Sequence, residues 1–539
     1  MRVLKKIIRE SSCKTLFSLV FSATLLVGCG GGGTVPGVPV HFEPVEASYS
    51  LAEPNSLVSV KNISDATLHL DLGTTPKNLY LVTTSYADNQ YISVNNTQSQ
   101  RVSNSKAAPT SDSSSNLQSR ILSFNENTFK LLRNRTYDTI QNSNRELRSS
   151  DVSEGISETF CVDMDSGYNC TRHVDATAVR VAREVTTAQG RKTLVVWLEN
   201  GVQINTKALD NIGNIFLQPG LNNDIYDWET NIYSKEWGAD AQHVDGNLIG
   251  DDATINILVY NIPNSRLAGF FWPKDTFKRS YLSASNEKIM FYINAQLLVS
   301  DEKETFTTLG HEFQHMIHFY QRAVLKDLHD STWFNEMMSE ATEDILATKI
   351  GYKGPRNVDP NDGTAGDANN KKGRYPGFNA HNRLSLTQWE SGVAHYGKVS
   401  AFGTFLLRNY GGAELLHKLM VSSSYDTKDL LESTGQSDIH TLVNQWGAAV
   451  IFSDKTSVAP KYRYNIGDFF YTEYNGIDYQ LGSINFFNYT PKPSFQKSAT
   501  INNNANLYTK IGDNLTGRID IKVNAPKGAI VTVIAKEHL

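Results

Sequence analysis

The feature that most constrains the fold of this chain is a pair of histidines, His311 and His315, with Glu312 directly after the first. Four positions are about one helical turn, so on a helix the two imidazoles share one face. A second stripe of the same segment is apolar, and it comprises Leu309, Phe313, Met316, Ile317 and Tyr320. A helix buried by that stripe needs a polar partner for its histidines and carboxylate, and a metal ion is such a partner.

The spacing of these residues points to zinc. Two imidazoles one turn apart can bind one tetrahedral zinc ion with bonds of about 2.0–2.1 Å. Zinc lowers the pKa of a bound water to about 7, and a neighbouring carboxylate can take the proton of that water as it attacks a carbonyl. We therefore expect one zinc ion per chain, with His311 and His315 as ligands and Glu312 as the catalytic carboxylate.

The third zinc ligand must come from another segment. One class of zinc proteins uses a histidine six residues after the second, with a glycine between them. In this chain Gln321 occupies the histidine position and His318 the glycine position, so that class is rejected.

A cluster of acids follows on a segment with helical patterning over residues 332–350. Its members recur at spacings of three and four, and they are Glu336, Glu340, Glu343 and Asp344. Such a face repels itself unless something cationic lies opposite. We expect a second, antiparallel helix that offers Glu336 to zinc, with Glu340 accepting the free N–H of a ligand histidine. The alternative is a solvated acidic face.

The combined pattern resembles the glutamate-zincins, the class that includes thermolysin: His-Glu-x-x-His is followed by Asn-Glu-x-x-Ser-Glu. A fuller set of strings is similar to the hyicolysin family of bacterial metallopeptidases, namely Gly269–Asp275, Ser285–Glu287, Met290–Asn294, His311–Ile317 and Asn335–Asp344. This likeness covers roughly residues 200–410. It implies that His311, His315 and Glu336 are ligands and that Glu312 is catalytic. One departure is Glu340, where thermolysin-like enzymes have the shorter aspartate.

A zinc peptidase also needs a donor for the oxyanion of the tetrahedral intermediate. His395 and Tyr396 are the candidates, just before a predicted helix over residues 396–410. A packing role for Tyr396 is an equally good interpretation. Asp359, Asp362 and Asp367 could bind calcium, but a polar loop is the favoured reading.

The N-terminus has the features of an export signal. A basic leader precedes an apolar run, Leu16–Val27, that is too short to span a membrane as a stable helix. Small residues before Cys29 resemble a bacterial lipobox, which implies a lipid-acylated (palmitate-type) cysteine at the new N-terminus. An ordinary cleaved signal with a chance cysteine is the alternative. In an oxidising compartment, Cys161 and Cys170 are most simply a disulfide.

The chain is too long for one core. We expect a signal peptide over 1–28, a lipid-anchored tether over 29–48, an N-terminal β module over 49–92, a polar linker over 93–150, a zincin metallopeptidase domain over 151–455 and a C-terminal β module over 456–539. The fold class is α+β, with the two subdomains of the zincin domain around a cleft. A net charge of −5 gives no basic field for nucleic acid.

These features predict a zinc endopeptidase that hydrolyses extracellular proteins or peptides. The chain is expected to act as a monomer, anchored through Cys29 to the outer membrane or cell surface, or released from it. An aminopeptidase is the alternative within the same class. A surface-binding or adhesive lipoprotein with an inactive zincin domain is the alternative from another class.

Overall fold

The computed structural model describes residues 45–96, 116–133, 152–250, 253–264, 267–390, 392–465 and 469–538. The predicted signal peptide, Cys29 and most of the predicted tether lie outside these residues. Of the helices within the described ranges, none is long and apolar enough to cross a membrane.

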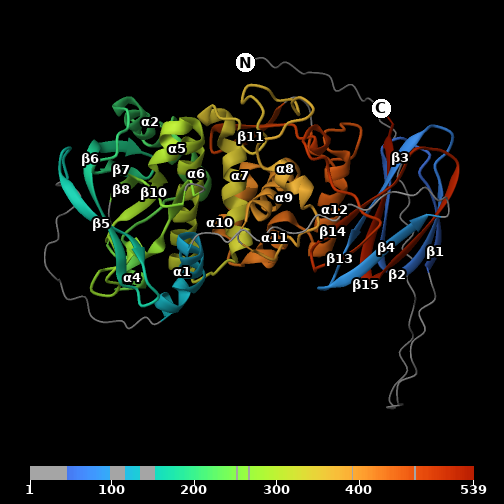
Figure 1. Ribbon diagram of the computed structural model, residues 1–539, viewed down its shortest axis with the longest axis horizontal. Helices are drawn as coiled ribbons and strands as arrows, with labels where there is room; N and C mark the ends of the chain where they lie inside the picture. Colours follow the sequence, from blue (N-terminus) through green and yellow to red (C-terminus); the bar gives the residue numbers. More distant parts are fainter. Residues whose placement is uncertain are drawn as a thin grey trace, which may run out of the picture. The chain divides into compact units, whose positions relative to one another are not determined.

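One mixed sheet lies beside the helix that carries the two histidines (Figure 1). Its strands, in spatial order, are β5 (Ser157–Met164), β6 (Cys170–Thr187), β7 (Gly190–Glu199), β8 (Thr254–Tyr260), β10 (Ile289–Asn294) and β9 (Gly269–Phe271). Strands β7, β8 and β10 run parallel, and β9 pairs antiparallel with β10 at the edge. Every residue of β8 and β10 is buried, as expected for strands covered on both faces. A disulfide joins Cys161 of β5 to Cys170 of β6.

Two long helices pack together beside this sheet. Helix α6 (Glu302–His318) begins at Asp301, whose side chain accepts a hydrogen bond from the backbone of Glu304, and it continues into a π-helical turn, Phe319–Val324. Helix α7 (Thr332–Ile350) ends at Gly351, which has the positive φ of 71° typical of a helix-terminating glycine. The two helices pack against each other, and α6 also contacts β9 and β10.

The other helices, apart from α1, form two groups along the chain. Those that precede α6 in the chain are α2 (Thr206–Phe216), α3 (Ile225–Tyr233), α4 (Asp240–Val244) and α5 (Ala295–Ser300). Those that follow α7 are α8 (Tyr375–Ala380), α9 (Val393–Asn409), α10 (Ala413–Val421), α11 (Asp426–Thr434) and α12 (Ile439–Phe452). Helix α9 packs on α7 and α8. The predicted α+β class is confirmed.

The two predicted β modules are not separate, and this corrects the domain assignment. Strands from both ends of the chain form one sheet: β1 (Val45–Ser50), β2 (Ser56–Asp71), β3 (Lys77–Thr84), β4 (Gln90–Asn96), β13 (Ser498–Ile501), β14 (Asn506–Leu515) and β15 (Arg518–Glu537). Strand β15 lies between β2 and β3, so the last long strand completes the sheet begun by the first ones. Only β11 (Phe469–Tyr474) and β12 (Ile477–Gly482) form a hairpin of their own among the described strands.

The predicted polar linker contains a helix, α1 (Asn116–Arg133). Its buried apolar side chains recur at helical spacing and pack into the main core, and they are Leu117, Ile121, Phe124 and Leu132. Serines, asparagines and glutamines between these positions gave the segment its linker-like composition. The apolar stripe, and not the mean composition, decides the structure.

Helix α12 packs against β3, β14 and β15 of the terminal sheet. Gly447 lies at the closest approach: a Cβ added there would lie 2.5 Å from Cγ1 of Val82 and 2.7 Å from Nδ2 of Asn506. This glycine therefore sets how closely the helix can approach the sheet.

We predict that Gly447→Ala lowers the free energy of unfolding by about 1–3 kcal/mol, because the added methyl overpacks this junction. Gly377→Ala in α8 is the matched control, since its added Cβ would only come within 3.9 Å of a backbone oxygen. Urea denaturation of both variants measures the difference. Equal stability of the two variants would show that the junction accommodates the methyl.

Candidate metal centre

Helices α6 and α7 bring three side chains together. His311 and His315 project from α6, and Glu336 projects from the start of α7. Oε2 of Glu336 lies 3.2 Å from Nε2 of His311 and 3.6 Å from Nε2 of His315. The three ligand atoms lie within 4.8 Å of one another.

This geometry fits zinc. A tetrahedral zinc ion with bonds of about 2.0–2.1 Å separates its ligand atoms by about 3.3–3.4 Å, close to the two distances found here. Oε2 of Glu336 is buried and makes no hydrogen bond of good geometry. A buried carboxylate oxygen without a donor is costly. A cation held between Glu336, His311 and His315 would compensate that cost.

The structure corrects the role predicted for Glu340. Nδ1 of His311 hydrogen-bonds to Oε1 of Glu343 at 2.8 Å, whereas Glu340 accepts a hydrogen bond from Nε of Arg374 at 2.8 Å. Glu336 and Glu343 are seven residues apart, which is close to two full turns, so both face α6. They approach the two nitrogens of one imidazole, and Glu340 faces the arginine instead.

The position of Arg374 decides between two possible metal sites. His311, Glu340 and Glu343 also lie close enough to hold a metal. However, the guanidinium of Arg374 lies 2.6 Å from Glu340 and 3.2 Å from Glu343. Burial alone would raise the pKa of Glu343, but Arg374 and His311 outweigh it and hold that pKa below its usual value. These two carboxylates already have a permanent cation, so the set with Glu336 is the better zinc site.

His315 is oriented by residues that the sequence analysis did not assign. Its Nδ1 lies 3.1 Å from Oδ1 of Asn335 and 3.2 Å from Oγ of Ser339. A metal-binding histidine usually donates its second N–H to such an acceptor. Both residues belong to the Asn-Glu-x-x-Ser string, and that string was the available signal.

Glu312 belongs to α6, and its carboxylate contacts β9, the edge strand of the sheet. Its Oε2 accepts a hydrogen bond of 2.8 Å from the backbone N–H of Phe271, at the end of β9. Burial raises the pKa of Glu312, although the two histidines act in the opposite direction. Glu312 lines a cavity of about 1590 Å³ together with His311, Glu343, Arg374 and Tyr396.

The two candidate oxyanion donors, Tyr396 and His395, have different surroundings in the structure. The hydroxyl of Tyr396 donates to Oε1 of Glu336 at 3.3 Å, and the ring lines the cavity. His395 turns away: its Nδ1 lies 3.2 Å from Nζ of Lys398, and its ring packs on Trp389. Burial lowers the pKa of His395 to about 4, so its imidazole is neutral at ordinary pH. Consecutive helical residues point in different directions, and Tyr396 lines the cavity whereas His395 is not among its lining residues. The predicted role of His395 as an oxyanion donor therefore has no support from this geometry.

Two aspartates of the predicted polar loop accept hydrogen bonds from backbone N–H groups two residues further on. Asp359 accepts a hydrogen bond from the N–H of Asn361, and Asp362 accepts one from the N–H of Thr364. His318, next to the site on α6, lies 3.1 Å from Oδ2 of Asp330. Neither arrangement adds a ligand to the metal centre.

Comparisons with known proteins agree with this site. A family model described as peptidase M30 matches residues 174–536, a range that includes every residue of the candidate metal centre. The neutral metalloprotease ShpI of Staphylococcus hyicus is 28% identical over 115 residues, which are 19% of this chain and 26% of the relative. The chain thus matches about a quarter of the length of that curated relative. Both findings confirm the resemblance to the hyicolysin family, and because the family model covers about two thirds of the 539 residues, the chain belongs to the peptidase M30 family.

Proposed function

We propose that this chain is a zinc metalloendopeptidase that hydrolyses peptide bonds of extracellular proteins. The observation that carries the proposal is the convergence of His311, His315 and Glu336. His311 and the adjacent Glu312 also line a large cavity. Membership of the peptidase M30 family supports the class of reaction. The similarity to a neutral metalloprotease supports the use of a metal.

We also propose the two-subdomain organisation of a zincin around this cavity. The sheet with α6 would form one wall, and the helices from α7 to α9 would form the other. The origin of the lining residues supports this division: Gly269 and Glu312 come from the first group of elements, and Glu343 and Tyr396 come from the second.

In the proposed reaction, the residues of this chain handle the protons and hold the carbonyl. When bound, zinc would act as a Lewis acid that lowers the pKa of water and polarises the scissile carbonyl. Glu312 would accept the proton of the attacking water at its carboxylate and later deliver it to the leaving amine. Its raised pKa, which is caused mainly by burial, suits a group that must both accept and release a proton. The N–H of Phe271 would fix one oxygen of this carboxylate during both transfers.

Tyr396 is the proposed donor to the oxyanion. Its hydroxyl already lies at the metal centre, 3.3 Å from Glu336. A small rotation of the phenol would direct the O–H at a substrate oxygen, where a developing negative charge is stabilised most strongly in a buried site. The guanidinium of Arg374 lies 5.6 Å from the ring centre and helps to hold the ring in place.

The shape of the cavity supports a polypeptide substrate. Its walls include Leu267 just before β9, Gly269 in β9, the segment Gly351–Gly354 after α7, and Gly392 and Val393 at the start of α9. The side chain of Val393 is 71% exposed, which is unusual for an apolar residue and suits contact with a substrate. A cavity of about 1590 Å³ can take several residues of an extended chain.

We predict that Glu312→Gln retains zinc but lowers the turnover of a casein substrate by about 100-fold or more, because the amide cannot accept a proton. Glu302→Gln on the same helix is the matched control and should keep both zinc and turnover. Zinc content by plasma mass spectrometry and initial rates on the same samples measure the two properties. Retained hydrolysis in Glu312→Gln would assign the base to another residue, and lost zinc would place Glu312 among the ligands.

We propose in addition that the chain is exported and anchored to the bacterial envelope through a lipid on Cys29. The basic leader, the apolar run Leu16–Val27 and the small residues before Cys29 support this assignment.

Cys29→Ser is expected to remove the lipid and shift the protein from the membrane fraction to the soluble fraction, because acyl chains supply the affinity for the bilayer. Immunoblots of fractionated cells measure the partition, with Cys13→Ser as the control that keeps the wild-type distribution. Unchanged membrane association of Cys29→Ser would overturn the anchor.

A further inference from the structure

Strand β9 sets the position of the proposed catalytic carboxylate. Its last residue, Phe271, donates the backbone hydrogen bond to Glu312. The strand has three residues and pairs only with β10 in the described sheet. A strand this short is held weakly by its own ladder. Something beyond the ladder must therefore fix where the N–H of Phe271 lies.

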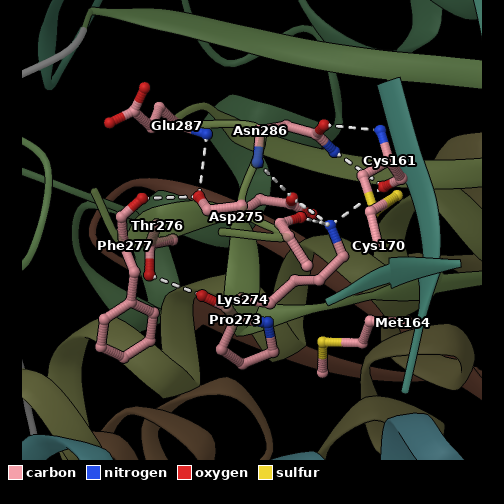
Figure 2. A network of polar contacts seen from close by, with 12 residues as sticks. Cys161, Met164, Cys170, Pro273, Lys274, Asp275, Thr276, Phe277, Asn286 and Glu287 are labelled. Atoms are coloured by element: carbon pink, nitrogen blue, oxygen red, sulfur yellow. Dashed lines mark hydrogen bonds and ion pairs between the residues drawn. A yellow bond between two sulfur atoms is a disulfide. The ribbon is translucent and has the colours of Figure 1, made fainter. Parts of the chain in front are cut away.

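A buried network lies directly after this strand (Figure 2). Lys274 and Asp275 are fully buried, and the ammonium of Lys274 contacts the carboxylate of Asp275. Nζ of Lys274 also donates to the carbonyls of Cys161 and Ala284, each at 3.0 Å. All three N–H bonds of the ammonium thus have acceptors.

The carboxylate of Asp275 is equally well held. It accepts hydrogen bonds from the hydroxyl of Tyr292 at 2.6 Å and from the backbone N–H of Asn286 at 2.9 Å. Tyr292 belongs to β10, and its ring stacks on Phe270 of β9 with ring centres 4.4 Å apart. The pair therefore ties the end of β9 to its neighbouring strand.

Asn286 connects the same pair to the disulfide-bonded hairpin. Its side-chain amide accepts from the N–H of Cys161 at 2.8 Å and donates to the carbonyl of Cys161 at 3.0 Å. The disulfide to Cys170 closes this hairpin of β5 and β6. Figure 2 shows Lys274, Asp275, Asn286 and Cys161 converging on one point. The network anchors the chain after β9 to the far edge of the same sheet.

The geometry points to a positioning role: we propose that Lys274, paired with Asp275, holds β9 so that the N–H of Phe271 orients Glu312 for the reaction. This inference rests on the proposed peptidase function. A buried ion pair is a weak source of stability, since apolar residues of similar volume often replace it without loss. Its directed hydrogen bonds do fix a backbone in one place, and here that backbone leads into the strand that contacts Glu312.

The test removes both charges at once, so that no buried charge is left alone. Lys274→Met with Asp275→Asn keeps the volume of both side chains. The matched control is Lys192→Met with Glu236→Gln, which neutralises another buried pair, 2.6 Å apart, whose described hydrogen bonds and ion pair do not involve β9. Lys274→Met alone serves as a second variant, because it keeps the carboxylate that Tyr292 and Asn286 bind.

We expect the Lys274/Asp275 double variant to bind zinc at the wild-type ratio and to keep KM within about threefold, while kcat falls by about 10–100-fold through misplacement of Glu312. Hydrogen exchange of the peptide that contains Phe271 should become faster in this variant and stay unchanged in the Lys192/Glu236 variant. Wild-type kcat in both Lys274 variants, or an equal loss of kcat in the Lys192/Glu236 control, would overturn the positioning role. An inactive wild-type enzyme would instead overturn the proposed function itself.

Discussion

The constraint on which the site depends is the charge of helix α7, which carries four buried acids. Three of them have a permanent cation: Arg374 lies against Glu340 and Glu343, and Arg408 lies 2.6 Å from Asp344. Among the described residues, Glu336 faces only two histidines and a tyrosine. Since an uncompensated buried carboxylate is costly, this imbalance is the physical argument for a metal ion between α6 and α7.

The sequence predicted the parts of the site that depend on local periodicity. His311, Glu312 and His315 lie on one helix because their spacing matches a helical turn, and the acids of α7 follow the same rule. Periodicity could not decide which acid meets His311, since Glu340 and Glu343 both lie on the buried side of α7. That choice depends on how α7 lies against α6 and on Arg374, which follows α7 in the chain and carries no pattern.

Long-range pairing was the other part that the sequence left open. Strand β15 pairs with β2 and β3, so that Arg518 of β15 lies opposite Asp71 on the adjacent strand β2. Alternating apolar residues indicate a strand but not its partner, so the sequence alone predicts two separate modules at the two ends. The contact of the Phe271 N–H with Glu312 is not predictable for a related reason: every residue except proline has a backbone N–H, so the sequence does not indicate which one acts as the donor.

The most direct test of this account is anomalous diffraction at the zinc edge from crystals of the purified protein. The account predicts one peak per chain, about 2.0–2.2 Å from Nε2 of His311, Nε2 of His315 and one carboxylate oxygen of Glu336. A peak between His311, Glu340 and Glu343, or no peak in protein purified without chelators, would contradict it.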